Sequence, residues 1–112
     1  MRMQQFLLQN ILKGRIPLVT EITIFTAIPG NEEALGQGII QGLDFIRQHP
    51  QCISANATRC LERPGRYMLS VVWTSVEAHT NEFRNGPLFQ KWRSYINNLF
   101  EGSPEVFHYE AY

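Results

Sequence analysis

The chain has 112 residues, and its 10 Lys and Arg residues balance its 10 Asp and Glu residues, so its formal charge at pH 7 is zero. This balance argues against a nucleic acid as the main partner, because phosphate binding depends on clustered basic side chains that release counterions. With 44% hydrophobic residues, the composition is that of one globular domain, which at this length buries roughly two-thirds of its unfolded surface.

The first 17 residues form an extension that precedes a domain expected over residues 18–112. Apolar residues between 6 and 12 lie near helical spacing, and Gly14 and Pro17 then break the pattern, which fits a short amphipathic helix. A poorly ordered extension fits the same residues equally well. The stretch lacks a small-residue cleavage site and is too short to span a membrane, so we expect a cytoplasmic location.

Two cysteines, Cys52 and Cys60, fall within one predicted strand. Eight residues of strand separate them by roughly 26 Å, whereas a disulfide needs about 5 to 6 Å between its Cα atoms. The chain contains no CxxC motif and no Cys/His cluster, so the sequence predicts neither an internal disulfide nor a metal site.

Two elements follow the extension. Residues 18–28 are rich in β-branched side chains without an internal Gly or Pro, which predicts a strand. Asn31 is then a good N-cap for a helix that Pro50 ends, with apolar residues repeating every three or four positions. Three glycines lie inside this helix, namely Gly36, Gly38 and Gly42. They indicate either close packing of the helix on the sheet or room for a ligand there.

The second half contains a hairpin, a broken helix and a last strand. Residues 52–63 and 67–74 predict two strands joined by a turn at Pro64-Gly65. Ser75 can cap a helix that Asn85-Gly86-Pro87 interrupts, and an apolar stripe continues beyond the break. Residues 105–112 predict the final strand.

The predicted order is β-α-β-β-α-β, which indicates an α+β, ferredoxin-like fold with both helices on one face of a four-stranded antiparallel sheet. In the first strand one parity carries Ile22 and Ile24, and the other carries Val19 and Phe25. Neither face therefore suits water, and we predict a homodimer that packs sheet against sheet.

Several segments together resemble the antibiotic biosynthesis monooxygenase (ABM) family. The likeness runs from about Leu18 to Tyr112 and is carried by His49-Pro50-Gln51-Cys52, Val72-Trp73, Thr74-Ser75-Val76-Glu77-Ala78-His79, Arg84-Asn85-Gly86-Pro87-Leu88-Phe89 and His108-Tyr109-Glu110. The resemblance implies a dimeric α/β barrel in which each subunit holds a cavity between its helices and its sheet.

The resemblance also implies an activity. The best-known members oxidise phenolic or quinol-like aromatic substrates with O2 and without a metal or flavin, because the deprotonated substrate supplies the electrons. A cofactor-independent monooxygenase acting on a small aromatic molecule is therefore the leading expectation. The alternative is a non-catalytic ligand-binding or structural dimer of the same fold, whose cavity its own aromatic side chains would fill.

Related members degrade haem, and the sequence disfavours that activity here. The stretch that matches their iron-ligating histidine is Gln90-Lys91-Trp92-Arg93, which contains no histidine. In those proteins a tryptophan that distorts the porphyrin would fall near Phe83, and this sequence lacks it. Glu21 stands where those proteins are expected to have an asparagine.

Three residues are the candidate catalytic groups. His79 lies on the inward face of its helix and could accept a phenol proton at neutral pH, or it could be a hydrogen-bonded core histidine. Trp73 matches a strand-end aromatic that lines the family's cavity, although core filling explains it equally well. Arg93, at the edge of the apolar stripe, could pair with a phenolate or carboxylate, or remain solvated.

Other residues are candidates for substrate contact. Three aromatic side chains could wall the cavity or fill the core: Phe83, Phe89 and Trp92. Asn56 and Ser70 are single polar residues in largely apolar strands and could touch substrate or bond across the sheet. In the last strand, His108 points opposite to Tyr109, and the sequence does not say which of them faces the helices.

Overall fold

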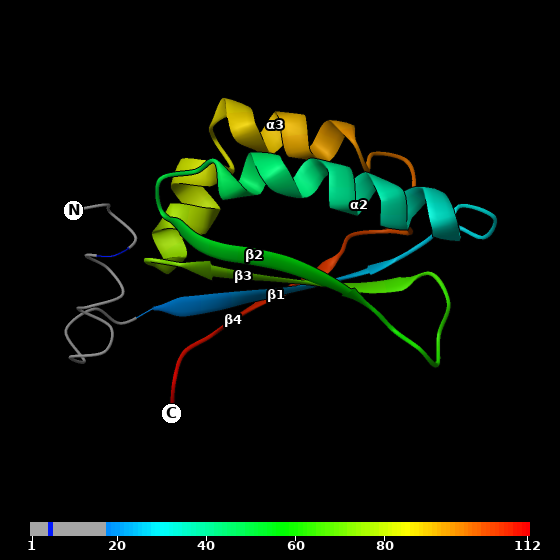
Figure 1. Ribbon diagram of the computed structural model, residues 1–112, viewed down its shortest axis with the longest axis horizontal. Helices are drawn as coiled ribbons and strands as arrows, with labels where there is room; N and C mark the ends of the chain where they lie inside the picture. Colours follow the sequence, from blue (N-terminus) through cyan, green and yellow to red (C-terminus); the bar gives the residue numbers. More distant parts are fainter. Residues whose placement is uncertain (1–4, 6–17) are drawn as a thin grey trace.

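The computed structural model describes Gln5 and residues 18–112, so the expectation for the N-terminal extension lies outside the described residues. Four strands form one sheet in the order β2-β3-β1-β4, and all neighbouring strands are antiparallel (Figure 1). Their bounds are β1 Val19–Thr26, β2 Cys52–Arg59, β3 Arg66–Trp73 and β4 Glu105–Tyr109. The predicted ferredoxin-like fold is confirmed.

The helices within residues 18–112 cover the same face of this sheet (Figure 1). They are α2 (Glu32–Arg47), the π-helix η1 (Ala78–Phe83) and α3 (Pro87–Ser94). The Ser75 hydroxyl accepts a hydrogen bond from the backbone N–H of Ala78 at 3.1 Å, as a capping residue does. Asn31 occupies the N-cap position of α2, but its side chain makes no capping hydrogen bond.

The glycines of α2 mark close packing, and two of the contacts are with α3 rather than with the sheet. A Cβ atom on Gly42 would lie 2.7 Å from the Trp92 ring, and one on Gly38 would overlap the carbonyl oxygen of Tyr95. Only Gly36 meets the sheet, where a Cβ atom would lie 2.5 Å from the Tyr67 hydroxyl. These glycines therefore allow close approach of helices and sheet, as the first of the two interpretations predicts.

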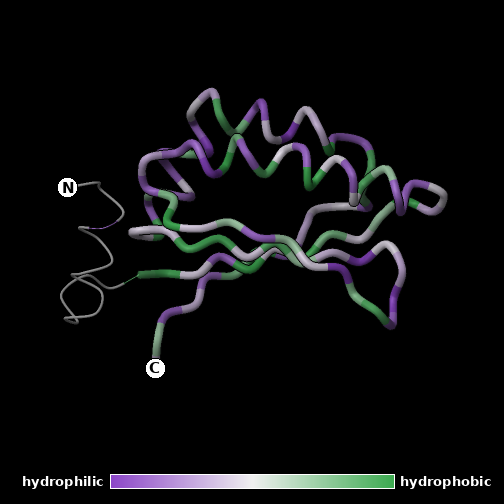
Figure 2. The backbone as a smooth tube through the Cα atoms, in the orientation of Figure 1, coloured by the Kyte–Doolittle hydropathy of each residue, from purple (hydrophilic) through white to green (hydrophobic). Residues whose placement is uncertain are grey.

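Strand alternation separates the two faces of the sheet. In β4, His108 pairs with Glu21 and faces the helices, whereas Phe107 and Tyr109 are each 55% exposed on the opposite face. The largest fully buried side chains lie between sheet and helices: Leu35, Ile39, Ile46, Val71, Trp73 and Ile96. Hydrophobic segments accordingly recur along the strands and along α2 (Figure 2).

Two further observations bear on the sequence predictions. Cys52 and Cys60 are both free thiols, as their separation along the strand predicts. Within the described part of the chain, none of the helices combines the length and the apolar character that a membrane crossing requires.

Candidate functional site

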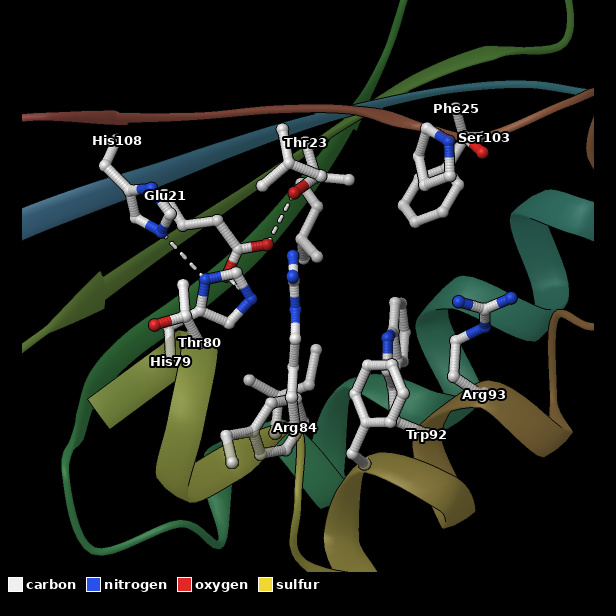
Figure 3. A pocket seen from close by; sticks show the side chains of 16 residues that line it. Glu21, Thr23, Phe25, His79, Thr80, Arg84, Trp92, Arg93, Ser103 and His108 are labelled. Carbon is white, nitrogen blue, oxygen red and sulfur yellow. Dashed lines mark hydrogen bonds and ion pairs between the residues drawn. The ribbon is translucent and has the colours of Figure 1, made fainter. Parts of the chain in front are cut away.

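A cavity of about 550 Å³ lies between the sheet and the helix layer (Figure 3). Its sheet wall comes from β1, β3 and β4, and its helix wall comes from α2, η1 and α3. The loop before β4 closes one side through Ser103 and Pro104. Because Thr80, Arg84 and Ser103 are exposed as well as lining it, the cavity opens to solvent beside these residues.

Glu21 is the buried acid of this cavity, with only 4% of its surface exposed. One carboxylate oxygen, Oε1, accepts a hydrogen bond from the indole Nε1–H of Trp73 at 2.9 Å. The other, Oε2, accepts from the hydroxyl of Thr23 at 2.5 Å. Burial raises the pKa of Glu21, although these two bonds and the nearby cations favour its charged form. The raised pKa makes Glu21 a stronger base than an exposed carboxylate.

His79 lies between Glu21 and His108. Its Nε2 is 3.3 Å from Glu21 Oε1, and its Nδ1 is 2.8 Å from Nε2 of His108. A carboxylate can only accept, so the arrangement that fits an ionised Glu21 places a proton on Nε2 of His79 and leaves Nδ1 to accept from His108. The three side chains thus form one connected proton path.

The Trp73 ring packs against one face of the His79 ring. The two rings are stacked, with centroids 5.3 Å apart and planes 14° apart. Burial, assisted by the positive charge of Arg84 and by His108, lowers the pKa of His79 to about 3. His79 is therefore neutral at neutral pH and donates or accepts single hydrogen bonds without carrying a charge.

Two arginines extend into the same cavity from the helix side (Figure 3). The Arg93 guanidinium lies over the rings of Phe89 and Phe100, 5.7 and 5.2 Å from their centroids. Its Nε donates to Asn97 Oδ1 at 3.2 Å. Burial and the neighbouring Arg84 lower the pKa of Arg93, which records both partial desolvation and repulsion between two cations.

The structure brings together most of the residues that the sequence singled out. Five of them line the cavity: His79, Phe83, Phe89, Trp92 and Arg93. Trp73 is fully buried and reaches the site through His79 and Glu21. Asn56 and Ser70 pair across β2 and β3 and do not line this cavity, because their parity places them on the opposite face of the sheet.

Sequence reasoning missed Glu21 as a site residue, and it left the direction of His108 open. The signal for Glu21 was present, because Glu21 and Thr23 share strand parity with the apolar Phe25 in a run without other charges. Arg84 was quoted only as part of the break between the helices, where nothing in the pattern separates it from a solvated residue.

Metal-ligand geometry is absent from the described residues. Among Gln5 and residues 18–112, no group of three or more His, Cys, Asp or Glu side chains is placed to hold a metal ion. The chemistry that this site can perform with its own groups is hydrogen bonding, proton transfer and aromatic contact.

A family model described as "Antibiotic biosynthesis monooxygenase" matches residues 18–95. The chain belongs to the antibiotic biosynthesis monooxygenase family. The matched range includes Glu21, His79, Arg84 and Arg93 and ends before β4, so the family match does not extend to His108.

Individual proteins are similar to this chain over most of its length. The uncharacterized protein YczJ of Bacillus subtilis (strain 168) is 25% identical over 93 residues, which are 83% of this chain and 98% of that protein. A solved structure of a candidate antibiotic biosynthesis monooxygenase from Bordetella bronchiseptica is 29% identical, with a TM-score of 0.80, and the match covers 86% of this chain and 98% of that one.

A more distant ABM candidate from Caulobacter crescentus CB15 shares the fold at 13% identity, with a TM-score of 0.72 over 86% of this chain and 91% of that one. Together these similarities establish a monooxygenase-type fold.

Proposed function

We propose that the protein is a cofactor-independent monooxygenase that oxidises a small phenolic or quinol-like aromatic substrate with O2. The observation that carries this proposal is the buried path from Glu21 through His79 to His108 beside an aromatic-walled cavity. Such a path can remove a phenol proton, and the resulting anion is the species that reduces O2. The two free thiols are consistent with a reducing compartment such as the cytoplasm.

The overall reaction balances without an external reductant. The substrate supplies four electrons to O2, one oxygen atom enters the substrate, and the other leaves as water. For a hydroquinone, the product is a hydroxyquinone. The protein's own tasks are to bind the flat ring, to accept its phenolic proton and to exclude bulk water while the anion meets O2.

The pKa shifts assign different roles to Glu21 and His79. A phenol has a pKa of about 10, so moving its proton to a histidine with a pKa of about 3 is uphill by roughly 10 kcal/mol. Glu21, whose pKa is raised, is the better final acceptor. We therefore assign proton uptake to Glu21, with His79 and His108 as the hydrogen-bonded pair that holds the Glu21 carboxylate in place.

Aromatic side chains of the helix wall provide the substrate-binding surface. Phe83 and Phe89 meet edge to face with centroids 5.6 Å apart, and Trp92 packs edge to face on Phe25 at 6.2 Å. These contacts hold the rings in fixed orientations, which favours binding of a planar molecule between them. An open cavity of about 550 Å³ supports an enzyme over a structural dimer whose aromatics fill its own interior.

Oxygen uptake with a panel of hydroquinones tests the proposal. We expect the wild-type protein to consume one O2 per substrate molecule, and Glu21→Gln to lower the rate about 10²- to 10⁴-fold, as loss of a general base does. His79→Ala should also lower it. Glu62→Gln is the matched control, because Glu62 is an exposed carboxyl in the turn between β2 and β3 and does not line the cavity.

Two results would contradict the enzyme. One is the absence of O2 uptake above the protein-free rate on every hydroquinone. The other is an equal rate in wild type and Glu21→Gln. Binding of the aromatic molecules without O2 uptake would support the non-catalytic alternative.

We also propose that a second copy of the chain covers the open face of the sheet. Phe107 and Tyr109 are each 55% exposed there, Met68 is 39% exposed, and the half-buried Ile22 and Ile24 lie between them on β1. A contiguous apolar face of this kind is rare on a monomer. In the proposed dimer, these strand faces of the two copies pack against each other in a two-fold, sheet-against-sheet arrangement.

A further inference from the structure

Two arginines enter the cavity without a carboxylate partner. In the described residues, the ion pairs join Arg47 with Asp44 and His79 with Glu21, and neither involves Arg84 or Arg93. Arg93 uses its Nε to bond Asn97, while its two terminal amino groups make no hydrogen bond with any described residue. These donors remain available to a ligand.

The position of the Arg93 guanidinium is fixed before any ligand binds. It lies over two aromatic rings, Phe89 and Phe100, and the hydrogen bond to Asn97 orients its plane. A guanidinium held in this way can present both terminal amino groups to one planar acceptor, which is the geometry that a carboxylate matches.

Arg84 and Arg93 both line the cavity. Partial burial lowers the pKa of Arg93, and the positive charge of Arg84 lowers it further. Two like charges in one cavity repel each other, and an anion bound there relieves the repulsion. Figure 3 shows both side chains within the cavity, with Arg84 extending toward Glu21 and Arg93 on the side of Trp92.

The charge of the cavity selects among anions. Its permanently positive lining residues are Arg84 and Arg93, and Glu21 is its one carboxylate. With Glu21 ionised, the lining carries one net positive charge, which a single negative charge on the ligand neutralises. A carboxylate meets this condition, whereas a doubly charged phosphate would leave an excess of negative charge.

We propose that Arg93 binds a carboxylate group of the substrate, with the positive charge of Arg84 in the same cavity adding to the attraction, so that the substrate is an aromatic acid whose phenolic hydroxyl lies toward Glu21. This assignment of the substrate class rests on the proposed function. A cavity of about 150 Å³ binds benzene, so about 550 Å³ accommodates a molecule with more than one ring. Such a molecule spans from Glu21 to Arg93.

Anaerobic equilibrium binding tests the proposal without requiring turnover. The probe is a hydroxynaphthoic acid with its hydroxyl and carboxyl at opposite ends of the ring system, compared with its neutral carboxamide and with the corresponding naphthyl phosphate. We expect the acid to bind the wild-type protein at least about tenfold more tightly than the carboxamide, as a charge-assisted pair predicts. It should also bind more tightly than the phosphate.

Variants of the two arginines test which side chain causes the preference for the acid over the carboxamide. Arg93→Gln should abolish the preference for the acid, and Arg84→Gln should reduce it. Arg93→Lys keeps the positive charge but cannot donate two parallel hydrogen bonds, so it should retain part of the preference for the acid. Arg63→Gln, in the exposed turn between β2 and β3, is the matched control and should bind like wild type. Thermal unfolding of each variant confirms that it is folded.

The outcomes separate this inference from the proposed function. Equal binding of acid and carboxamide, a preference that survives in Arg93→Gln, or tighter binding of the phosphate would overturn the carboxylate assignment, even if neutral hydroquinones are oxidised. A clear preference for the acid without O2 uptake on any substrate would support the assignment and contradict the monooxygenase.

Discussion

Where β1 pairs with β4, the two faces of the sheet are unusual, because polar side chains lie on the covered face and apolar side chains lie on the open face. The face covered by helices carries Glu21, Thr23 and His108, whereas the open face carries Ile22, Ile24 and Phe107. Antiparallel sheets ordinarily place apolar residues inside and polar residues outside. Here the covered face holds a polar site within its core, and the open face exposes apolar side chains that the proposed second copy would cover.

Each face accounts for its unusual residues in a different way. On the covered face the polar groups satisfy one another, and no buried side-chain nitrogen or oxygen of the described residues lacks a hydrogen-bond partner. On the open face, Phe107 and Tyr109 remain 55% exposed among the described residues. The comparison teaches that burial on one side depends on hydrogen bonds within the chain, whereas burial on the other would come from the proposed association.

The largest expected effect is on the covered face, at Trp73. Trp73→Ala should lower the free energy of unfolding by about 3 to 5 kcal/mol, since it empties a fully buried site and removes the N–H donor to Glu21. Val72→Ala, its neighbour on the open face, should cost less than about 1.5 kcal/mol in the monomer. Urea unfolding measures both, and equal losses would contradict the distinction between the faces.

The second-largest effect is expected on the open face, at Phe107. Phe107→Glu should raise the dissociation constant of the proposed dimer about 100-fold or more, because it replaces an aromatic side chain in the proposed interface with a charge. Sedimentation velocity over a range of concentrations measures this constant. Binding of the aromatic acid should change less than about threefold. A wild-type protein that sediments as a monomer at high concentration would contradict the proposal that a second copy covers the open face.

The pH dependence of stability isolates His79. Its folded pKa of about 3 lies below its ordinary value of 6.5, so the folded state binds fewer protons and stability falls as the pH falls through this range. Between pH 7 and pH 5 this loss is about 2 kcal/mol. The raised pKa of Glu21 acts in the opposite direction, since its contribution to stability falls as pH rises.

Comparing wild type with His79→Gln isolates the effect of His79 on stability, because Glu21 is present in both proteins and its contribution largely cancels. Urea unfolding at pH 7 and pH 5 should show a smaller loss of stability in His79→Gln than in wild type. Equal losses in the two proteins would mean that His79 titrates in the folded state as it does in the unfolded chain.

The smallest effects are expected at two polar residues of the open face. Ser70→Ala and Asn56→Ala should each change kcat/KM for O2 uptake by less than about twofold, because neither side chain lines the cavity. Steady-state kinetics on the best hydroquinone provide the measurement. A tenfold loss in either variant would place part of the substrate site on the open face and contradict the functional difference between the two faces.

Much of the fold was predictable because its signals are local. Runs of β-branched residues mark the strands, and Pro50, Pro64-Gly65 and Asn85-Gly86-Pro87 mark where elements end. The strand predictions ran past Arg59 and Tyr109, because residue alternation continues into exposed turns where pairing has stopped. The π-helical form of η1 was not predicted, since apolar spacing alone does not separate it from an α-helix.

The candidate site was predictable only in part. His79, Phe83, Trp92 and Arg93 stood out because helical spacing places them near one stripe. Glu21 and His108 come from strands at opposite ends of the chain, and only pairing of β1 with β4 sets them opposite one another. Parity shows which residues share a face, but it does not show which face the helices cover.

By itself, the sequence determined the order of the elements, the family resemblance and the apolar character of both sheet faces. Local spacing and residue type are sufficient for these properties. The tertiary structure decided that Glu21, His79 and His108 meet, that two arginines share their cavity, and that the glycines of α2 contact α3. Each of these depends on strand register and helix placement, which bring together residues far apart in the chain.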